Sequence, residues 1–311
     1  MTVTVVMSAY NAEKFISQTI ESVLIQSFSD FQYIIINNGS TDNTLNIINK
    51  YAEEDNRIIV DNHHNMGKSE AINRAVKVLA TGDYIFHIDA DDIMLKNRIE
   101  RQRHFLQTNN LEATSCLAHY ITAENIRIGK TLNTVPSLSV FNDYISKNEP
   151  IGLLNPGFVV SKKKFLEVGG YRSQYWPADD IDLYNRLTEI DVTILVQPEI
   201  LMSFRVHGDS TIASKFIESR KKYEWVRESM WARRKGLIEP TWENYLTKLN
   251  SKSFLQKLNW KRKAYAKQYM HLAKFDLGKK KYGDLMFHIL KAILMQPVYV
   301  SKKITSHIIK N

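Results

Sequence analysis

A regular alternation of short apolar runs and helical patterns over residues 1–90 most constrains the fold. Aliphatic, β-branched and aromatic residues dominate four runs, at residues 3–7, 33–36, 58–60 and 84–88. Between these runs, apolar residues recur every three or four positions, as in amphipathic helices. Apolar strands that alternate with helices are typical of a parallel sheet covered on both faces. The sequence therefore predicts an α/β fold.

Polar residues follow three of these predicted strands. In chain order they are Tyr10 with Asn11, then Asn37, Asn38, Gly39 and Ser40, and finally Asp89, Ala90, Asp91 and Asp92. Ligands of such sheets bind beyond the carboxyl ends of the strands, and carboxylates there suit Mg²⁺ or Mn²⁺ bridged to a diphosphate. A second interpretation makes Asp91 or Asp92 the cap of the helix expected over residues 95–105.

Charge divides the chain into two parts. Residues 1–214 hold 19 Lys and Arg against 26 Asp and Glu, a net charge of −7, whereas residues 215–311 hold 23 against 7, a net charge of +16. Beyond residue 214 strand patterns give way to helical ones, including a hairpin over residues 272–297 with Gly278 and Gly283 in its turn. We predict an α/β domain over 1–214 and a basic α-helical region over 215–311. This region faces anionic lipid or nucleic acid, or it is an ordinary solvated helical surface.

Several features bear on the cellular setting. Cys116 is the sole cysteine, which excludes an intramolecular disulfide and a cysteine-based zinc site. The first residues lack the basic start of a signal peptide, and the apolar stretch at 285–300 is too short and too polar to cross a bilayer. We expect a cytoplasmic protein, peripheral at the inner face of the plasma membrane.

A set of short motifs, in order along the chain, resembles family 2 glycosyltransferases of the GT-A fold. The motifs are Ser8-Ala9-Tyr10-Asn11, residues 36–42, Asn65-Met66-Gly67 with Asn73, residues 82–85, Asp89-Ala90-Asp91-Asp92, Gly169-Gly170-Tyr171, residues 179–183, Arg186-Leu187 and Phe204-Arg205-Val206-His207. The resemblance covers about residues 1–214. It implies a Rossmann-like, mostly parallel sheet and an inverting, nucleotide-sugar-dependent enzyme of bacterial cell-surface polysaccharide synthesis.

The resemblance also implies a nucleotide-sugar site. Its residues would be Ala9, Tyr10, Asn38, Lys68, Asp89 and Ala90. Asn38 stands where the family commonly has an aspartate that accepts a uracil N–H, so a UDP-sugar is favoured while thymine, guanine and cytosine stay open. Two alternatives without a function in binding remain: Tyr10 as a core residue and Lys68 as an exposed lysine at a helix start.

By the same resemblance, Asp91 and His207 bind a divalent metal, Mn²⁺ or Mg²⁺, and Asp180 is the general base. A positioned carboxylate that takes the proton of an acceptor hydroxyl contributes roughly 10²- to 10⁴-fold to the rate. The alternatives are a structural role for His207 and an N-cap role for Asp180, in a helix beginning near Ile181.

The expected partners are a nucleotide-sugar donor, a lipid-linked or growing glycan acceptor, and an anionic membrane surface that meets residues 215–311. No nucleic-acid motif accompanies the basic region, so we expect no nucleic-acid partner. Two other functions remain open. A catalytically inactive nucleotide-sugar-binding scaffold would have lost carboxylates, and a nucleotidyltransferase usually has a Gly-rich basic loop where this chain has Ser8-Ala9-Tyr10-Asn11.

Overall fold

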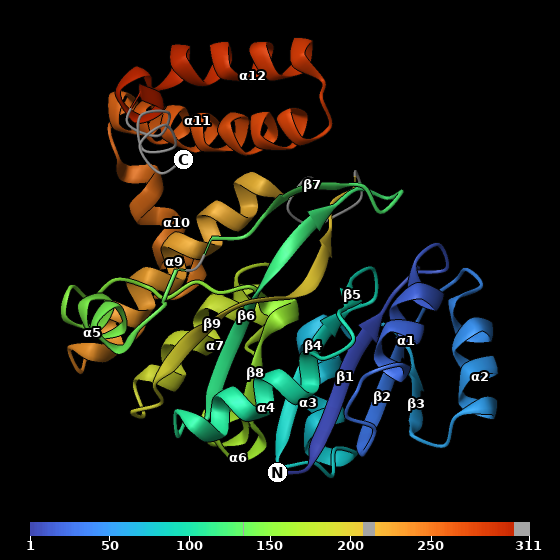
Figure 1. Ribbon diagram of the computed structural model, residues 1–311. Coiled ribbons are helices and arrows are strands. Elements are labelled where there is room, and N and C mark those ends of the chain that lie inside the picture. The colour runs from blue at the N-terminus through green and yellow to red at the C-terminus, as the bar shows by residue number, and fades with distance from the viewer. Residues whose placement is uncertain (133, 208–214, 302–311) are drawn as a thin grey trace.

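The computed structural model describes residues 1–132, 134–207 and 215–301, and a nine-stranded sheet lies at its centre (Figure 1). The strand order is β3-β2-β1-β4-β8-β6-β9-β5, with β7 paired to β6. The strands are β1 (Val3–Ala9), β2 (Phe31–Asn38), β3 (Ile58–His63), β4 (Tyr84–Asp89), β5 (Ile93–Met94), β6 (Ala113–Ile121), β7 (Arg127–Lys130), β8 (Val159–Ser161) and β9 (Ile194–Arg205).

Helices cover both faces of this sheet and extend beyond it. They are α1 (Ile16–Leu24), α2 (Thr44–Glu54), α3 (Lys68–Val78), α4 (Arg98–Thr108), α5 (Leu138–Ser146), α6 (Lys162–Glu167), α7 (Asp179–Thr188), α9 (Phe216–Arg234), α10 (Trp242–Ser251), α11 (Phe254–Gly278) and α12 (Tyr282–Met295), with short 3₁₀ turns at Asn155–Gly157 and Ser173–Tyr175.

Strands β3, β2, β1 and β4 are parallel, as the sequence predicts. Their register places Ser8 opposite both Ile36 and Asp89, so the carboxyl ends of β1, β2 and β4 meet at one edge. The other half of the sheet is mixed. Strand β8 runs antiparallel to β4 and β6, β9 is parallel to β6, and β5 is antiparallel to β9. Strand β9 has 12 residues, and its far end reaches back to the Asp89 edge, where Arg205 binds the carbonyl of Asp91.

Alternation along the strands divides the core between the two faces. Val5 and Met7 point to the face covered by α1 and α4, whereas Val6 points to the face covered by α3 and α7. All three side chains are essentially inaccessible to solvent. Both faces of β1 are therefore buried, and the buried polar side chain within the strand, Thr4, donates a hydrogen bond to Oε1 of Gln32 at 2.8 Å.

The helices after residue 215 pack on the sheet domain through a third core. Trp225 and Val226 of α9 lie against Tyr175 and Ala178, just before α7, and Tyr245 of α10 completes the cluster. Helices α11 and α12 form an antiparallel hairpin beyond β7 (Figure 1).

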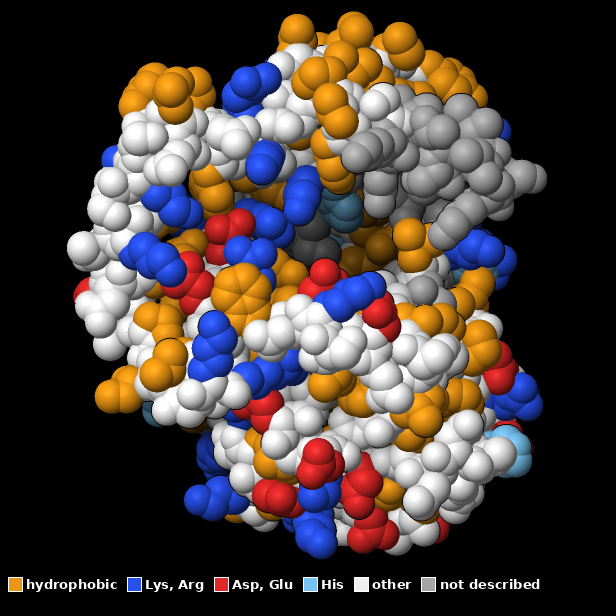
Figure 2. Space-filling view, turned by 90° about the vertical axis from the view of Figure 1, so that its left-hand side faces the viewer, with side chains coloured by type: hydrophobic (Ala, Val, Ile, Leu, Met, Phe, Trp, Pro, Cys, Tyr) orange, Lys and Arg blue, Asp and Glu red, His pale blue; other side chains and the backbone are white. Residues whose placement is uncertain are grey.

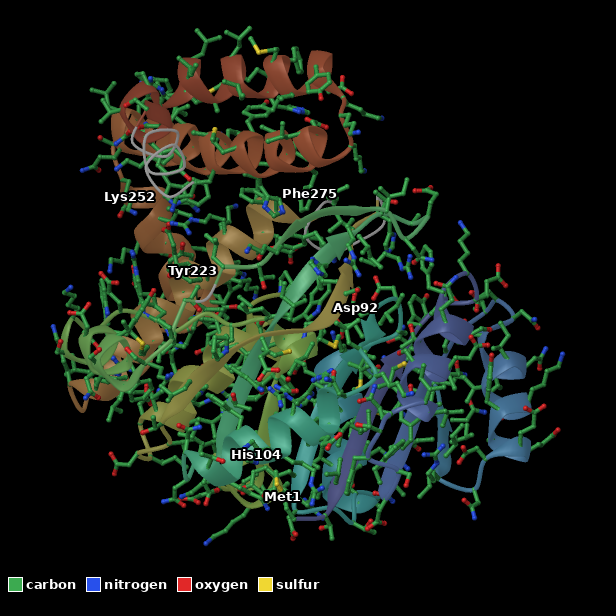
Figure 3. The ribbon with its side chains drawn as sticks, viewed as in Figure 1. Met1, Asp92, His104, Tyr223, Lys252 and Phe275 are labelled. Carbon is green, nitrogen blue, oxygen red and sulfur yellow. The ribbon has the colours of Figure 1, made fainter. Side chains whose placement is uncertain are left out.

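Glycines occupy different places in this hairpin from those the sequence suggested. Gly278 is the last residue of α11 and Gly283 lies inside α12, while Lys279, Lys280 and Lys281 make the turn. Gly278 permits close packing, because a Cβ there would lie 2.2 Å from the carbonyl oxygen of Ile128 in β7. Phe275, one turn earlier, packs edge-on against Tyr120 of β6 at 5.5 Å between ring centroids (Figure 3).

Replacing Gly278 by Ala should destabilise the protein, because the added methyl group must displace the β7 backbone, at a cost of about 1–3 kcal/mol. Gly283 provides a matched control, since no atom lies within 4 Å of its added Cβ. Gly283→Ala should stabilise helix α12 by up to about 1 kcal/mol. Denaturant unfolding of both variants tests this, and a Gly278→Ala protein as stable as the parent would show that the contact is not tight.

Candidate active site

Lys68 and Asp89 form an ion pair at the carboxyl edge of the sheet. Asp89 ends β4, and Lys68 begins α3 directly after Gly67, whose positive φ of 85° turns the chain toward β4. Burial opposes the charge on Lys68, yet Asp89, followed by Asp179 and Asp91, raises the pKa of the ammonium group above its ordinary value. Lys68 is therefore a charged, partly buried residue at the start of α3, and it is held there by an ion pair.

Asp91 and His207 meet from opposite halves of the sheet. The Nε2 atom of His207, which follows β9, lies 2.9 Å from Oδ2 of Asp91. The ring of Phe15 packs against the imidazole at 5.1 Å between centroids. One carboxylate oxygen and one imidazole nitrogen at this separation fit one side of a Mn²⁺ or Mg²⁺ site.

Asp91 and His207 alone would not complete the coordination of a metal ion. Within the described ranges, no three His, Cys, Asp or Glu side chains are grouped to hold an ion. Donor phosphate oxygens and water would have to supply the other ligands, as is usual for Mg²⁺ bound with nucleotides.

Asp92 has a structural role that the motif did not reveal. Its side chain is completely buried, and Oδ1 accepts the backbone N–H of Arg205 at 2.8 Å. Burial, together with Asp91 and Asp89, raises the pKa of this carboxyl group well above its ordinary value. The helix-cap interpretation is wrong, because α4 begins only at Arg98, with Asn97 at the N-cap.

The guanidinium group of Arg205 also binds the turn that follows β4. It donates to the Asp91 carbonyl at 2.7 Å and to the side chains of Asn125 and Gln18. It thereby ties β9, α1 and the turn after β4 together. The motif contained Arg205, but nothing in its spacing indicated this partner set, since Gln18 is 187 positions away in the chain.

The predicted nucleobase residues lie at the ends of β1 and β2. Ala9 is fully buried, whereas the Tyr10 side chain is 53% exposed, so Tyr10 is not a core residue. Asn38 is buried, and its Oδ1 accepts the backbone N–H of Met66 at 3.0 Å. This bond sets the orientation of the amide, which leaves the Nδ2 donors for a further partner. Ala90 is nearly buried beside Asp89.

Two carboxylates open helix α7 next to the Lys68 pair. Oδ2 of Asp179 accepts the Ser69 hydroxyl at 2.6 Å, which joins the starts of α3 and α7. Asp180 accepts the N–H of Ile181 at 2.8 Å, and burial followed by the charge of Asp179 raises its pKa to about 7. Asp180 is not the N-cap, because α7 already begins at Asp179.

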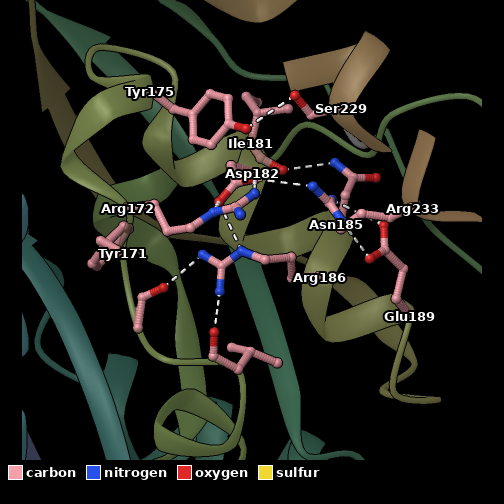
Figure 4. Close-up of polar contacts among 12 residues, drawn as sticks. Tyr171, Arg172, Tyr175, Ile181, Asp182, Asn185, Arg186, Glu189, Ser229 and Arg233 are labelled. Atoms are coloured by element: carbon pink, nitrogen blue, oxygen red, sulfur yellow. Dashed lines mark hydrogen bonds and ion pairs between the residues drawn. The ribbon is translucent and has the colours of Figure 1, made fainter. Parts of the chain in front are cut away.

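A buried ionic network holds α7 in place (Figure 4). Asp182, which is inaccessible to solvent, accepts hydrogen bonds from Nε of Arg172 at 2.9 Å and Nε of Arg186 at 2.7 Å. Arg172 also binds Glu239, which follows α9, at 2.9 Å. The i,i+4 spacing of Asp182 and Arg186 was a readable signal. The distant partners had no such signal in the sequence, although they connect α7, which carries Asp180, to the C-terminal helices.

Two cavities lie between α9 and α11, away from the carboxylates. They measure about 450 and 170 Å³ and share Arg220, Lys267 and Tyr299 in their linings. Figure 2 shows a hollow edged by Lys and Arg side chains on this side of the molecule. Burial, and then the charge of Arg220, lowers the pKa of Lys267. Arg220 is paired with Glu224 at 3.3 Å, and the remaining basic side chains Lys263 and Lys267 favour an anionic ligand.

An α/β sheet with carboxylates, a lysine and a histidine at its carboxyl edge is an arrangement typical of nucleotide-dependent transferases. Comparison with known families narrows this class. Residues 4–170 match the model of glycosyl transferase family 2. The chain belongs to this family and is a glycosyltransferase.

Individual relatives agree with this assignment. An uncharacterized glycosyltransferase of Methanocaldococcus jannaschii is 30% identical over 241 residues, which is 75% of this chain and 80% of the relative. The UDP-Glc:α-D-GlcNAc-diphosphoundecaprenol β-1,3-glucosyltransferase WfaP of Escherichia coli is 38% identical over 110 residues, which is 35% of this chain and 43% of WfaP.

Solved structures share the fold at low sequence identity. S. aureus TarS 1-349 with UDP-GlcNAc superposes with a TM-score of 0.57 at 14% identity, over 96% of this chain and 92% of TarS 1-349. The mannosyltransferase PcManGT of Pyrobaculum calidifontis, in complex with GDP-Man and Mn²⁺, superposes with a TM-score of 0.54 at 14% identity, over 94% and 86%. The fold is therefore GT-A, as predicted.

Replacing Asp182 by Asn should destabilise the protein by about 3–5 kcal/mol, because the arginines around it would lose their buried counter-charge. Asp143→Asn is the matched control, since Asp143 pairs with Lys147 on the exposed face of α5. This second change should cost less than about 1 kcal/mol. Thermal unfolding of the two variants measures the difference, and equal stabilities would mean that the network does not hold α7.

Proposed function

We propose that this protein is an inverting glycosyltransferase that moves a sugar from a nucleotide-diphosphate donor to an acceptor hydroxyl. One observation carries the proposal: Asp180 has a pKa of about 7 at the start of α7, where Asp179 is linked through Ser69 to the Lys68–Asp89 region. A carboxyl group with this pKa is a competent base near neutral pH, whereas an exposed aspartate with a pKa of about 3.9 is weaker.

The proposed chemistry follows from these positions. The Asp180 carboxylate accepts the proton of the acceptor hydroxyl as its oxygen attacks the anomeric carbon. The bond from that carbon to the donor phosphate oxygen breaks on the opposite side, so the configuration inverts. The charge of Lys68, which is paired with Asp89, would stabilise the diphosphate that leaves. A divalent cation held by Asp91 and His207 would neutralise further charge on the diphosphate.

For the donor we propose a UDP-sugar. The relative WfaP is named for UDP-Glc, and TarS has been solved with UDP-GlcNAc. Asn38 is the residue expected to contact the nucleobase of the donor, so the preferred nucleobase should be measured. Its oxygen already binds Met66, so its Nδ2 would donate to a carbonyl or ring nitrogen of the base.

For the cofactor we propose Mn²⁺ or Mg²⁺ at Asp91 and His207. The structural relative PcManGT was solved with Mn²⁺. The retained carboxylates Asp91, Asp179 and Asp180 argue against an inactive scaffold, and the family assignment argues against a nucleotidyltransferase.

For the acceptor we propose a lipid-linked glycan of cell-surface polysaccharide synthesis, reached at the inner face of the plasma membrane. The name of WfaP describes a diphosphoundecaprenol-linked acceptor. Residues 215–311 carry a net charge of +16, which suits an anionic membrane surface, and Arg220 and Lys267 line a cavity that suits a diphosphate. No helix within the described ranges is long and apolar enough to cross a membrane.

Asp180→Asn should lower turnover by roughly 10²- to 10⁴-fold while donor affinity changes little, because the amide cannot accept the hydroxyl proton. In the parent, kcat/KM should fall about ten-fold per pH unit below about 7, as the Asp180 carboxylate becomes protonated. The residual rate of the variant should lose this acid limb. Steady-state kinetics and donor titrations measure these effects.

Asp191→Asn, at an exposed turn after α7, is the control and should match the parent in rate and pH profile. Full turnover in Asp180→Asn, or the same acid limb in its residual rate, would remove Asp180 from the mechanism.

A panel of nucleotide sugars tests the donor and the metal together. Thermal stabilisation and slow donor hydrolysis should be strongest for a UDP-sugar and should require Mn²⁺ or Mg²⁺. Asp91→Asn and His207→Ala should weaken Mn²⁺ binding in calorimetry by at least about ten-fold, since each removes one ligand. Unchanged Mn²⁺ affinity in both would place the metal elsewhere, and a preference for another base would overturn the UDP assignment.

A further inference from the structure

Helix α12 presents an apolar face to solvent instead of burying it. Six of its apolar side chains are between 38% and 76% exposed, namely Tyr282, Met286, Phe287, Leu290, Ile293 and Leu294. At 100° per residue they span an arc of about 140°, in which the sequence has no charged or polar side chain other than the tyrosine hydroxyl.

The polar contacts of α12 lie on the inner face of the hairpin. Nδ1 of His288 lies 2.6 Å from Oδ2 of Asp276 on α11, and Ala292 is completely buried. Surface helices normally show the reverse arrangement, with the apolar stripe turned toward the core. A contiguous exposed apolar patch of this kind marks an interaction surface.

Lysines border the apolar arc. Lys279, Lys280 and Lys281 are exposed in the turn that leads into α12. Lys291 lies at the edge of the arc with its Nζ 4.1 Å from the centroid of the Phe287 ring. An apolar strip with cationic flanks complements a bilayer surface, where acyl chains meet anionic headgroups, and long lysine side chains reach outward from such a strip.

We infer that α12 lies in the membrane interface, with its apolar arc inserted among lipid acyl chains and its lysines at the anionic headgroups. The inference rests on the membrane-linked acceptor proposed above, and it adds a hydrophobic anchor to the charge attraction. With 14 residues, or about 21 Å, the helix lies in the plane of the surface and does not span about 30 Å of hydrocarbon. Repulsion between the cationic regions disfavours a second copy as the occupant.

The α11–α12 hairpin is fixed to the sheet, so the inserted face of α12 has a defined direction relative to the candidate active site. Gly278 contacts Ile128 of β7, and Phe275 contacts Tyr120, whose ring packs on Phe204 at 5.9 Å. Phe204 directly precedes Arg205, which binds the turn of Asp91. The membrane plane and the metal-binding turn are thus connected through packed side chains.

Flotation of the full chain with phosphatidylglycerol-containing vesicles, at about 0.1 M and about 1 M salt, tests the inference. The parent should stay partly bound at high salt, because insertion of apolar side chains is not screened. The triple variant Phe287→Gln, Leu290→Gln and Leu294→Gln should reduce the high-salt partition coefficient by at least about ten-fold. These side chains are exposed, so the fold should persist.

Two controls separate the contributions. A triple variant at exposed apolar residues elsewhere, Ile25→Gln, Val78→Gln and Leu138→Gln, should bind like the parent. Changing Lys279, Lys280 and Lys281 to Gln should weaken binding at low salt only. Complete release of the parent at high salt, or equal binding of the α12 variant and the parent, would overturn the inference.

Other occupants give different results. A parent dimer that the α12 variant converts to a monomer in sedimentation, with no vesicle binding by either, would assign the face to a second copy and overturn the inference. Donor hydrolysis without vesicles reports separately on the active site and should be unchanged in the α12 variant. Loss of hydrolysis in the parent itself would count against the proposed function and not against the membrane face.

Discussion

Crowding of carboxylates around Lys68 is the electrostatic constraint on which the site depends. Asp89 pairs with this lysine directly, and Asp91 and Asp179 act on it through space. Carboxylates brought together at a partly buried site repel one another strongly, because the effective dielectric constant there is well below that of water. The starts of α3 and α7 meet here through Ser69 and Asp179, so two helix N-termini add positive potential.

Burial of Asp180, followed by its repulsion from Asp179, favours a proton on this carboxyl group, and this affects stability. The pKa of Asp180 is about 7 in the folded protein, against about 3.9 for an exposed aspartate. Between these values the folded chain holds a proton that the unfolded chain has lost. The stability contributed by this group is therefore present at low pH and declines as pH rises from about 4 to about 7. A bound divalent cation would also reduce the repulsion between the carboxylates, because it adds positive charge beside them.

Much of the site edge could be predicted, because local patterns determine it. Apolar runs ending in polar residues located Asp89 and Asn38 at strand ends, and the parallel register brought those ends together. The mixed half of the sheet was harder to predict from the sequence, because β5 has only two residues and pairs with a strand more than 100 positions later. Contacts such as Arg172 with Glu239 depend on how α9 packs, which no local period reports. The outward face of α12 was likewise hidden, because apolar spacing reveals a stripe but not the side to which it turns.

Arg205 shows how a site can separate rigidity from charge balance. Its guanidinium binds the backbone carbonyl of Asp91 and leaves the carboxylate oxygens of that residue to other partners. Arg205 thus holds the turn in place without occupying the carboxylate of Asp91. Lysine at this position would keep the charge but not the planar fork, whose separate N–H groups reach several acceptors at once. We therefore expect Arg205 to vary less among relatives than the side chains that contact the donor.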